Sequence, residues 1–344
     1  LRGVVERGDF AVRGYEIENS QLPARQGFNY SDPEWGLLEW MPAYFGGDGT
    51  TVKLVGYHPG NPELRGIPSV LSTICVFDTD SGHLRGIVDG TFLTAARTGA
   101  ASAVASRVLA LPDSRVVGIV GCGAQAVTQA HALSRVFDLD HVLAYDTDRG
   151  TADSLQGRIA RTGLRVEVVG RESLEQKLES CDILCTCTSS APGQGPVVPE
   201  FDNRPHLHIN AVGSDFPEKF EVPLAMLRRA LVVPDFPEQA IVEGECQQLD
   251  RAEIGPDLRT MLSNELLYRK QRNALTVFDS TGWALEDHVA ASIALDYAEE
   301  LGLGREAEFE CLASDPKNPY SFLESDVPVA ESQDQQMAEL GVTR

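Results

Sequence analysis

Short apolar runs alternate with segments of helical pattern through the middle of the chain, from about Val116 to Asp235. Each run is short enough to form a buried strand, and helices are expected to begin between the strands at Ala124, Arg149 and Ser173. Strands that alternate with helices predict a parallel sheet that is covered on both faces. The expected strands are 116–120, 141–145, 166–169, 182–187, 207–212 and 230–234.

Residues 36–93 show a different pattern, in which apolar segments are separated by turn-forming clusters of proline, glycine, asparagine, aspartate and serine. This pattern is typical of antiparallel strands. The expected strands here include 51–57, 70–78 and 84–89. An alanine-rich helix is expected to follow from Leu93 to about Ala110, and it ends there because Pro112 cannot continue it.

The first turn of the alternating region reads Gly121-Cys122-Gly123-Ala124-Gln125-Ala126. Gly121 permits a tight turn, Gly123 lets the backbone approach a pyrophosphate, and Ala126 is small enough for close packing of helix on strand. Free amides at the start of the following helix would face the phosphates. The next apolar run ends in Asp146, where an acid bonds the ribose hydroxyls and repels a 2′-phosphate. The sequence therefore predicts NAD binding, and the alternative is a turn that binds no ligand.

Two further helices are expected at 253–267 and 284–301. If the helix at 93–110 pairs with the one at 284–301, the first domain is discontinuous and the nucleotide domain is inserted in it. The expected fold is α/β, a doubly wound parallel sheet of the Rossmann type within a discontinuous α+β domain. The predicted division assigns 1–112 and 280–330 to substrate binding and dimerisation, 113–279 to NAD binding, and 331–344 to a polar tail.

Composition and charge narrow the class of protein. The 344 residues are 42% hydrophobic and 23% charged, as in soluble globular proteins, and no apolar run approaches the ~20 residues of a membrane-spanning helix. The formal net charge of −22 argues against a nucleic-acid partner, because phosphates would be repelled. The seven cysteines are expected to be small buried side chains in a reducing cytoplasm. The histidines show no metal-binding spacing, so no metal site is expected.

Three charged residues stand where a ligand would meet them. Lys53, in an apolar strand, is suited to bind a carboxylate or move a proton, although a solvated lysine on an edge strand fits the same pattern. Arg97 is the only charge in a run of small residues, which favours a carboxylate or phosphate clamp over a surface group. Asp215 follows an expected parallel strand, where it acts as a general base or caps a helix. Gly282 either lets the backbone approach a flat ring or starts the next helix.

Together these stretches resemble the ornithine cyclodeaminase/μ-crystallin family over nearly the whole chain. Within the family they look most like the bacterial lysine and ornithine cyclodeaminases, and residues 123–135 are particularly similar to lysine enzymes that make pipecolate. The segments that carry the resemblance are Arg25, 38–42, Lys53, 97–100, 121–126, 145–148, 210–215, 243–249, 278–282 and 315–321.

The resemblance implies a homodimeric enzyme that converts L-lysine to L-pipecolate, or L-ornithine to L-proline, with release of ammonia and regeneration of NAD. It implies that Arg25, Lys53 and Arg97 hold the substrate carboxylate. Glu39 would face the distal amino group, and Asp215 would be the acid/base, with Lys53 as the other catalytic group. The residues implied in NAD binding are Thr98, Gly121, Gly123, Ala124, Gln125, Asp146, Thr147, Thr186, Val212, Gly213 and Ser280.

Two alternatives remain open. The first is an NAD(P)H-dependent ketimine reductase or an alanine-type amino-acid dehydrogenase, because these enzymes share the fold. The second is a non-catalytic, crystallin-like protein that binds a ligand. Glu39 favours a substrate with a distal amine over alanine, and Lys53 with Asp215 favours catalysis over binding alone.

Overall fold

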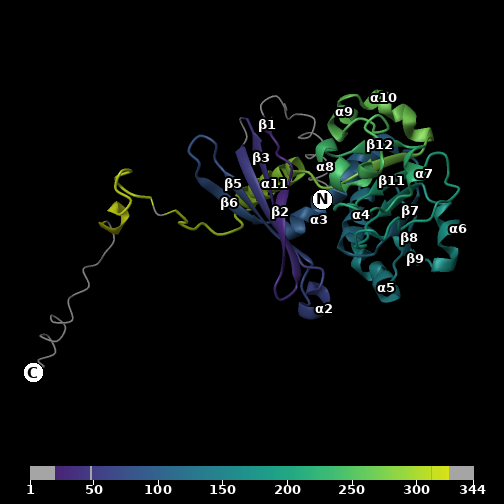
Figure 1. Cartoon of the computed structure of the whole chain (residues 1–344), viewed down its shortest axis with the longest axis horizontal. Coiled ribbons are helices and arrows are strands. Elements are labelled where there is room, and N and C mark those ends of the chain that lie inside the picture. Colours follow the sequence, from purple (N-terminus) through teal and green to yellow (C-terminus); the bar gives the residue numbers. More distant parts are fainter. Residues whose placement is uncertain (1–19, 47–48, 311, 325–344) are drawn as a thin grey trace, which may run out of the picture. The chain divides into compact units, whose positions relative to one another are not determined.

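The computed structural model describes residues 20–46, 49–310 and 312–324. The chain divides into two units, Leu1–Tyr297 and Ala298–Arg344. The first unit holds a parallel sheet and an antiparallel sheet (Figure 1). Within the second unit, the described residues include a short 3₁₀ helix at Ser321–Glu324. The polar tail expected at 331–344 lies outside the described residues.

The parallel sheet confirms the expected doubly wound architecture. Its seven strands follow the order β12-β13-β11-β10-β7-β8-β9, and every neighbouring pair is parallel. From β7 the next two strands, β8 and β9, are added toward one edge of the sheet, and the chain then returns to add β10 on the other side of β7. Ligands bind in such sheets at the point where the order of the strands changes in this way. The strands are β7 (Val116–Val120), β8 (His141–Tyr145), β9 (Arg165–Val168), β10 (Ile183–Thr186), β11 (His208–Ala211), β12 (Leu231–Pro234) and β13 (Thr276–Asp279).

Two sequence expectations for this region need correction. β13 was not among the expected strands, yet it pairs with both β11 and β12, and all four of its residues are buried. The helix expected at 253–267 is instead two short helices, α9 (Leu258–Ser263) and α10 (Glu265–Tyr268). Gly255 and Pro256 interrupt the earlier part, and the side chain of Asp257 then caps α9 by accepting a hydrogen bond from Thr260 N.

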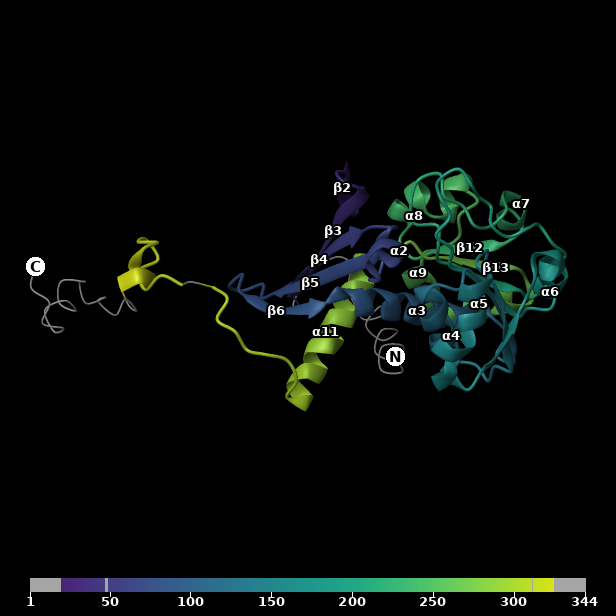
Figure 2. The ribbon, with the colours of Figure 1, turned by 90° about the horizontal axis from the view of Figure 1, so that it is seen from below.

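Helices surround the parallel sheet on both faces, as Figure 2 shows. None of the described helices is long and apolar enough to cross a membrane. The remaining helices of the first unit outside the antiparallel sheet are α4 (Ala124–Leu133), α5 (Arg149–Arg158), α6 (Leu174–Leu178), α7 (Leu224–Leu227) and α8 (Pro237–Glu243). The first three begin within one residue of the positions that the sequence predicted.

The antiparallel sheet confirms the pattern expected for residues 36–93. Its strands follow the order β1-β3-β4-β5-β6, and β2 also pairs with β3. β4 is therefore a central strand. The elements are β1 (Ser20–Gln21), β2 (Gln26–Ser31), β3 (Trp35–Phe45), β4 (Gly49–Tyr57), α2 (Asn61–Arg65), β5 (Val70–Phe77) and β6 (Leu84–Asp89).

Two long helices, α3 (Gly90–Leu109) and α11 (Ala284–Leu301), pack on one face of the antiparallel sheet (Figure 2). Ile74 of β5 packs there against Leu93 of α3 and Ala290 of α11. α3 also packs on α4, where a Cβ atom on Gly99 would lie 2.6 Å from Thr128 O. The small residues of α3 therefore serve close helix packing, and this contact joins the antiparallel sheet to the part of the chain that holds the parallel sheet.

Candidate active site

The carboxyl edge of the parallel sheet collects most of the residues implied in NAD binding. Parallel strands place their carboxyl ends at one edge, so residues far apart in sequence become neighbours there. These residues are Gly121 after β7, Asp146 and Thr147 after β8, Thr186 at the end of β10, Val212 and Gly213 after β11, and Ser280 after β13.

The turn between β7 and α4 has the geometry that the glycines predict. Gly121 has a φ of +91°, and a Cβ atom there would lie 2.7 Å from the Cys187 backbone, so glycine is required. Gly123 precedes α4 without a side-chain cap, and nothing lies within 4 Å of the place its Cβ would occupy. The first amides of α4 thus have room for a phosphate. Ala126 is fully buried beneath the turn.

Asp146 and Arg158 hold this turn from the side of β8 and α5. Asp146 Oδ2 accepts a hydrogen bond of 2.7 Å from Cys122 N. Arg158 donates to the carbonyl oxygens of Cys122 and Gly123, at 2.6 and 3.1 Å. The glycine turn, the open start of α4 and the acid at the end of β8 together fit a dinucleotide without a 2′-phosphate.

Three of the residues implied in NAD binding have distinct surroundings. Thr98 lies on α3, where its hydroxyl donates to Thr94 O. The side chain of Gln125 accepts from Thr128 Oγ1. Ser280 is buried, and its Oγ has no hydrogen-bond partner among the described residues. A buried hydroxyl without a protein partner is suited to a ligand atom.

Lys53 and Arg97 contact two carboxylates that sequence reasoning missed. Lys53 is 2% exposed on the central strand β4, so the alternative of a solvated lysine on an edge strand is wrong. Its Nζ lies 2.6 Å from Asp287 Oδ2. Arg97 is also buried, with Nε 3.1 Å from Asp287 Oδ1 and Nη1 2.8 Å from Glu286 Oε2. Asp287 therefore bridges Lys53 and Arg97, the two residues expected to hold a carboxylate.

Burial dominates the ionisation of this group. Burial lowers the pKa of Lys53 to about 8, against the opposing attraction of Asp287 and with the help of Arg97. Burial raises the pKa of Glu286 to about 8, while Arg97 works in the other direction. Burial also acts to lower the pKa of Arg97, but Asp287 and Glu286 outweigh it and the pKa is raised. Arg97 is thus a permanent cation, and Lys53 is one that titrates near neutral pH.

Gly282 packs directly on the Arg97 guanidinium. Its φ is +87°, and a Cβ atom there would lie 2.6 Å from Arg97 Nη2. Its amide donates to Asp235 Oδ2 at 2.7 Å. α11 begins two residues later, at Ala284. The glycine therefore serves close approach to a planar group, and that group is the arginine side chain.

Arg25 lies among acidic groups from three other segments. Its Nη2 is 2.6 Å from Glu243 Oε1, and it donates to the Asp215 backbone oxygen at 2.8 Å. Its Nε is 3.5 Å from Oε1 of Glu39, which lies on β3. Burial acts to lower the pKa of Arg25, but Glu243, Glu39 and Asp215 outweigh it and the pKa is raised. The role of Arg25 toward a substrate carboxylate stays a prediction.

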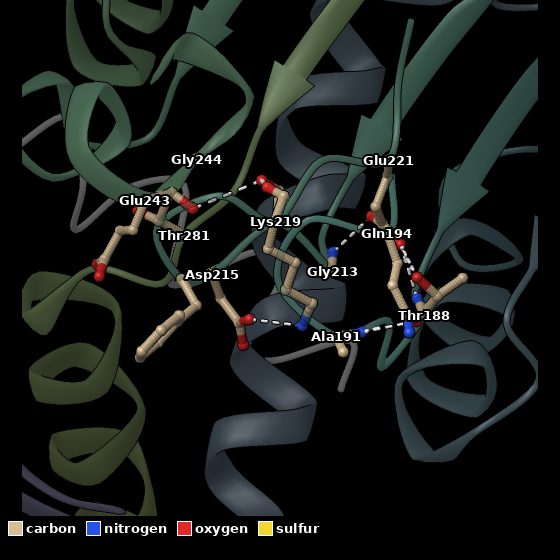
Figure 3. Close-up of polar contacts among 12 residues, drawn as sticks. Thr188, Ala191, Gln194, Gly213, Asp215, Lys219, Glu221, Glu243, Gly244 and Thr281 are labelled. Carbon is tan, nitrogen blue, oxygen red and sulfur yellow. Dashed lines mark hydrogen bonds and ion pairs between the residues drawn. The ribbon is translucent and has the colours of Figure 1, made fainter. Parts of the chain in front are cut away.

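Asp215 and Lys219 point toward each other in Figure 3. Lys219 Nζ lies 2.8 Å from Asp215 Oδ1, and the lysine side chain is 9% exposed while the aspartate is 51% exposed. Burial acts to lower the pKa of Lys219, but Asp215 outweighs it and the pKa is raised. No helix begins at Asp215 among the described residues, so the alternative of a helix cap is wrong. The half-exposed carboxylate is available to a ligand.

Glu221 fixes the backbone around the end of β11. Its carboxyl group accepts hydrogen bonds of 2.7 Å from Thr188 N, Thr188 Oγ1 and Gly213 N (Figure 3). Burial raises the pKa of Glu221, and these hydrogen bonds oppose the shift. Sequence reasoning missed this residue, although an acid between Phe220 and Val222 in an apolar stretch was a usable signal.

Among the described residues, His208 and five cysteines are buried, whereas Cys75 is only partly buried, which differs from the expectation. His208 is buried between Thr276 and Asn210, and burial lowers its pKa to about 3. Burial raises the pKa of Cys185 to about 12, as expected for a small buried side chain. Within the described ranges, no three His, Cys, Asp or Glu side chains are arranged to hold a metal ion.

Comparison with known proteins places the chain in one family. The family model for ornithine cyclodeaminase/mu-crystallin matches residues 17–301. The L-lysine cyclodeaminase of Streptomyces rapamycinicus is 42% identical over 305 residues, covering 89% of this chain and 88% of that protein. A solved lysine cyclodeaminase structure, described for recognition of L-lysine, L-ornithine and L-2,4-diaminobutyric acid, has a TM-score of 0.88 and 44% identity, covering 93% of each chain.

A more distant solved structure shows how widely this fold is used. An archaeal alanine dehydrogenase dimer with bound NAD superposes with a TM-score of 0.80 and 30% identity, covering 89% of this chain and 94% of that one. Its activity differs from cyclodeamination, so the fold alone does not decide the reaction. The chain itself belongs to the ornithine cyclodeaminase/mu-crystallin family.

Proposed function

We propose that this protein is an NAD-dependent cyclodeaminase of a basic L-amino acid, converting L-lysine to L-pipecolate or L-ornithine to L-proline with release of ammonia. The observation that carries the proposal is the separation of charge in the site. Lys53 and Arg97 supply cations for a carboxylate, and Glu39, Asp215 and Glu243 supply acidic groups for amines. The similarity to lysine cyclodeaminases supports this reading.

The charged residues of the site have separate roles toward the substrate. Lys53 and Arg97 hold the substrate carboxylate by charge-assisted hydrogen bonds. Glu39 faces the distal amino group, and Asp215 moves its proton. The turn at the start of α4 would hold NAD, which would supply a hydride acceptor for Cα before ring closure and a hydride donor after it. The distal nitrogen attacks C2 between these two events, and ammonia leaves.

Two alternatives make different use of the same fold. A ketimine reductase or alanine-type dehydrogenase would leave Glu39 without a distal amine to bind. A crystallin-like binding protein would not need the half-exposed Asp215 beside buried Lys219. Glu39 and Asp215 therefore favour cyclodeamination of a diamino acid.

The test is to incubate the protein with L-lysine or L-ornithine and a small amount of NAD. We expect many equivalents of ammonia and cyclic product for each NAD, with no steady accumulation of NADH. Many equivalents for each NAD are expected because the nucleotide is regenerated in each turnover. Stoichiometric NADH would identify a dehydrogenase, and absence of any product from either amino acid would contradict the proposal.

Asp146 is expected to set the preference for NAD over NADP. Replacing Asp146 with serine should narrow that preference by about tenfold to a hundredfold, because it removes the ribose hydrogen bonds and the repulsion of a 2′-phosphate. The measurement is kcat/KM with each cofactor. Asp148→Ser is the matched control, since Asp148 caps α5 and should alter stability alone. Equal use of both cofactors by the unmodified protein would contradict this assignment.

We propose that the protein forms a homodimer through the outer face of the antiparallel sheet. Leu54, Leu71 and Ile87 are 42%, 42% and 51% exposed on neighbouring strands of that face. Phe28 on β2 adds to the same apolar surface. Contiguous apolar patches of this kind mark protein interfaces. The dimeric state of the archaeal alanine dehydrogenase supports the proposal.

The substitutions Leu54→Glu and Ile87→Glu together should give a monomer. The dissociation constant is expected to rise about a thousandfold or more, because each unpaired carboxylate buried in the interface costs several kcal/mol. Sedimentation or light scattering would measure the mass. Leu266→Glu, on the 79% exposed side chain of α10, is the matched control and should leave the mass unchanged. A Leu54/Ile87 variant that keeps the parent mass would exclude this face.

A further inference from the structure

Glu243 is an acidic residue at the site to which neither the sequence pattern nor the family resemblance assigned a role. It ends α8, and its side chain is 12% exposed. Oε1 lies 2.6 Å from Arg25 Nη2, and the same nitrogen donates to the Asp215 backbone oxygen at 2.8 Å. The Glu243 carboxyl group and the Asp215 backbone therefore meet at one guanidinium nitrogen.

The helix that carries Glu243 also borders the expected carboxylate anchor. Gln239, one turn earlier on α8, donates to the carbonyl oxygen of Gly282 at 3.0 Å. Gly282 packs directly on the Arg97 guanidinium. A substrate carboxylate and the α-amino group share one carbon atom, so an acid on this helix is suited to serve the α-amino nitrogen.

Asp215 and Glu243 have contrasting environments. Asp215 is half exposed and pairs with the Lys219 ammonium. Glu243 is largely buried, and burial raises its pKa to about 7, against the opposing effect of Arg25. Two carboxyl groups with different environments in one site are the usual arrangement for two separate proton-transfer roles.

If the proposed function is correct, the reaction requires two carboxyl groups that accept protons. The inference rests on that proposed function. The substrate enters with two ammonium groups and leaves as a ring ammonium and an ammonium ion, so no net proton is released. The α-ammonium must lose one proton before hydride can leave Cα. The distal ammonium must lose another before its nitrogen can attack C2. One carboxylate can hold only one of these protons.

We propose that Glu243 is a catalytic residue that serves the α-amino nitrogen, while Asp215 serves the distal nitrogen. Glu243 accepts the first proton from the α-ammonium. After ring closure it gives that proton back to the same nitrogen and takes one from the ring nitrogen. The C2–N bond to the α-nitrogen then breaks with its electron pair leaving on ammonia, and the ring nitrogen forms the C2=N bond.

The remaining protons return to the products. Glu243 gives its proton to ammonia, and Asp215 gives its proton to the ring nitrogen after C2 is reduced. Both carboxyl groups thus end as they began. Arg25 acts here as a positioning residue, because its guanidinium binds Glu243 and the Asp215 backbone at once.

Glu243→Gln and Asp215→Asn should show crossed behaviour with substrate and product. Mixed with L-lysine and NAD, Asp215→Asn should give a burst of NADH, because the α-amine can still lose its proton. Glu243→Gln should give none. Mixed with L-pipecolate and NAD, Glu243→Gln should give the burst, because only the ring nitrogen must lose a proton, and Asp215→Asn should give none. Rapid absorbance measurements of reduced nicotinamide record each burst.

Control variants separate chemistry from folding. Glu243→Gln should lower steady-state turnover about 10²–10⁴-fold, and Glu243→Asp should recover part of it. Glu238→Gln changes an exposed acid on the same helix and should behave as the unmodified protein. Fluorescence should show that Glu243→Gln binds NAD, and thermal unfolding should show that the variant is folded.

Three outcomes would overturn the inference. Normal turnover by Glu243→Gln would remove Glu243 from the chemistry. A burst with L-lysine from that variant would place its role after hydride departure, and failure with pipecolate as well as lysine would make the role structural. In all three cases the unmodified protein would still make cyclic product. If the unmodified protein makes none from either diamino acid, the proposed function fails together with this inference.

Discussion

Replacing Asp215 with asparagine is expected to lower turnover about 10²–10⁴-fold, the usual contribution of a positioned general base. Asparagine has nearly the same size, so the site keeps its shape, but the side chain can no longer accept a proton. The distal ammonium would then stay protonated and could not attack C2. NAD binding should change little, because the α4 turn and its anchoring groups are untouched.

The measurement is kcat and KM for ammonia release, with NAD affinity determined separately. Asp153→Asn is the matched control, because Asp153 forms an exposed ion pair with Arg149 on α5 and contributes little to stability. Asp215→Asn also leaves buried Lys219 without its carboxylate, so thermal unfolding should accompany the kinetics. Near-normal cyclisation by Asp215→Asn would transfer the proton-handling role to Lys53 or Glu39.

The parallel-sheet part of the chain was predictable because the sequence signals for it are local. A strand that ends at Gly121 must turn tightly, and the positive φ and the crowded Cβ position explain why glycine stands there. The acid at Asp146 follows the next strand, and its place at the same edge is a consequence of parallel pairing. Periodicity and turn chemistry within a few residues were therefore sufficient.

β13 escaped prediction because it lies beyond the alternating region of 116–235, and its place between β11 and β12 depends on long-range pairing. The electrostatic partners escaped for the same reason. Lys53 and Asp287 are separated by more than two hundred residues, yet they form an ion pair of 2.6 Å. The sequence pattern showed that Lys53 and Arg97 were unusual cations, but only the packing of α11 under the sheet shows what neutralises them.

Lys53→Met is expected to raise KM about tenfold to a hundredfold, because it removes a charge-assisted hydrogen bond to the substrate carboxylate worth about 1.5–3 kcal/mol. A smaller fall in kcat should accompany it, since the anchored carboxylate positions Cα for hydride transfer. The fold should persist, because Asp287 keeps its contact with Arg97. Steady-state kinetics with L-lysine would measure both effects, and Lys177→Met, at an exposed ion pair, is the matched control.

The pKa of Lys53 adds a dependence on pH that the substitution isolates. Because burial lowers this pKa from 10.5 to about 8, the side chain loses its charge above about pH 8, and KM of the unmodified protein should rise there. Lys53→Arg should remove that rise, since arginine stays charged.

The contribution of Lys53 to folding stability should increase with pH over the same range in which substrate binding weakens. Between about pH 8 and 10.5 the unfolded chain binds more protons at Lys53 than the folded chain, so the contribution of this residue to the free energy of unfolding grows as pH rises. The difference in the free energy of unfolding between the unmodified protein and Lys53→Met, measured by denaturant unfolding, isolates this contribution.

A KM that stays flat from pH 7 to 9.5 in the unmodified protein would show that Lys53 does not bind the substrate carboxylate as a titrating cation.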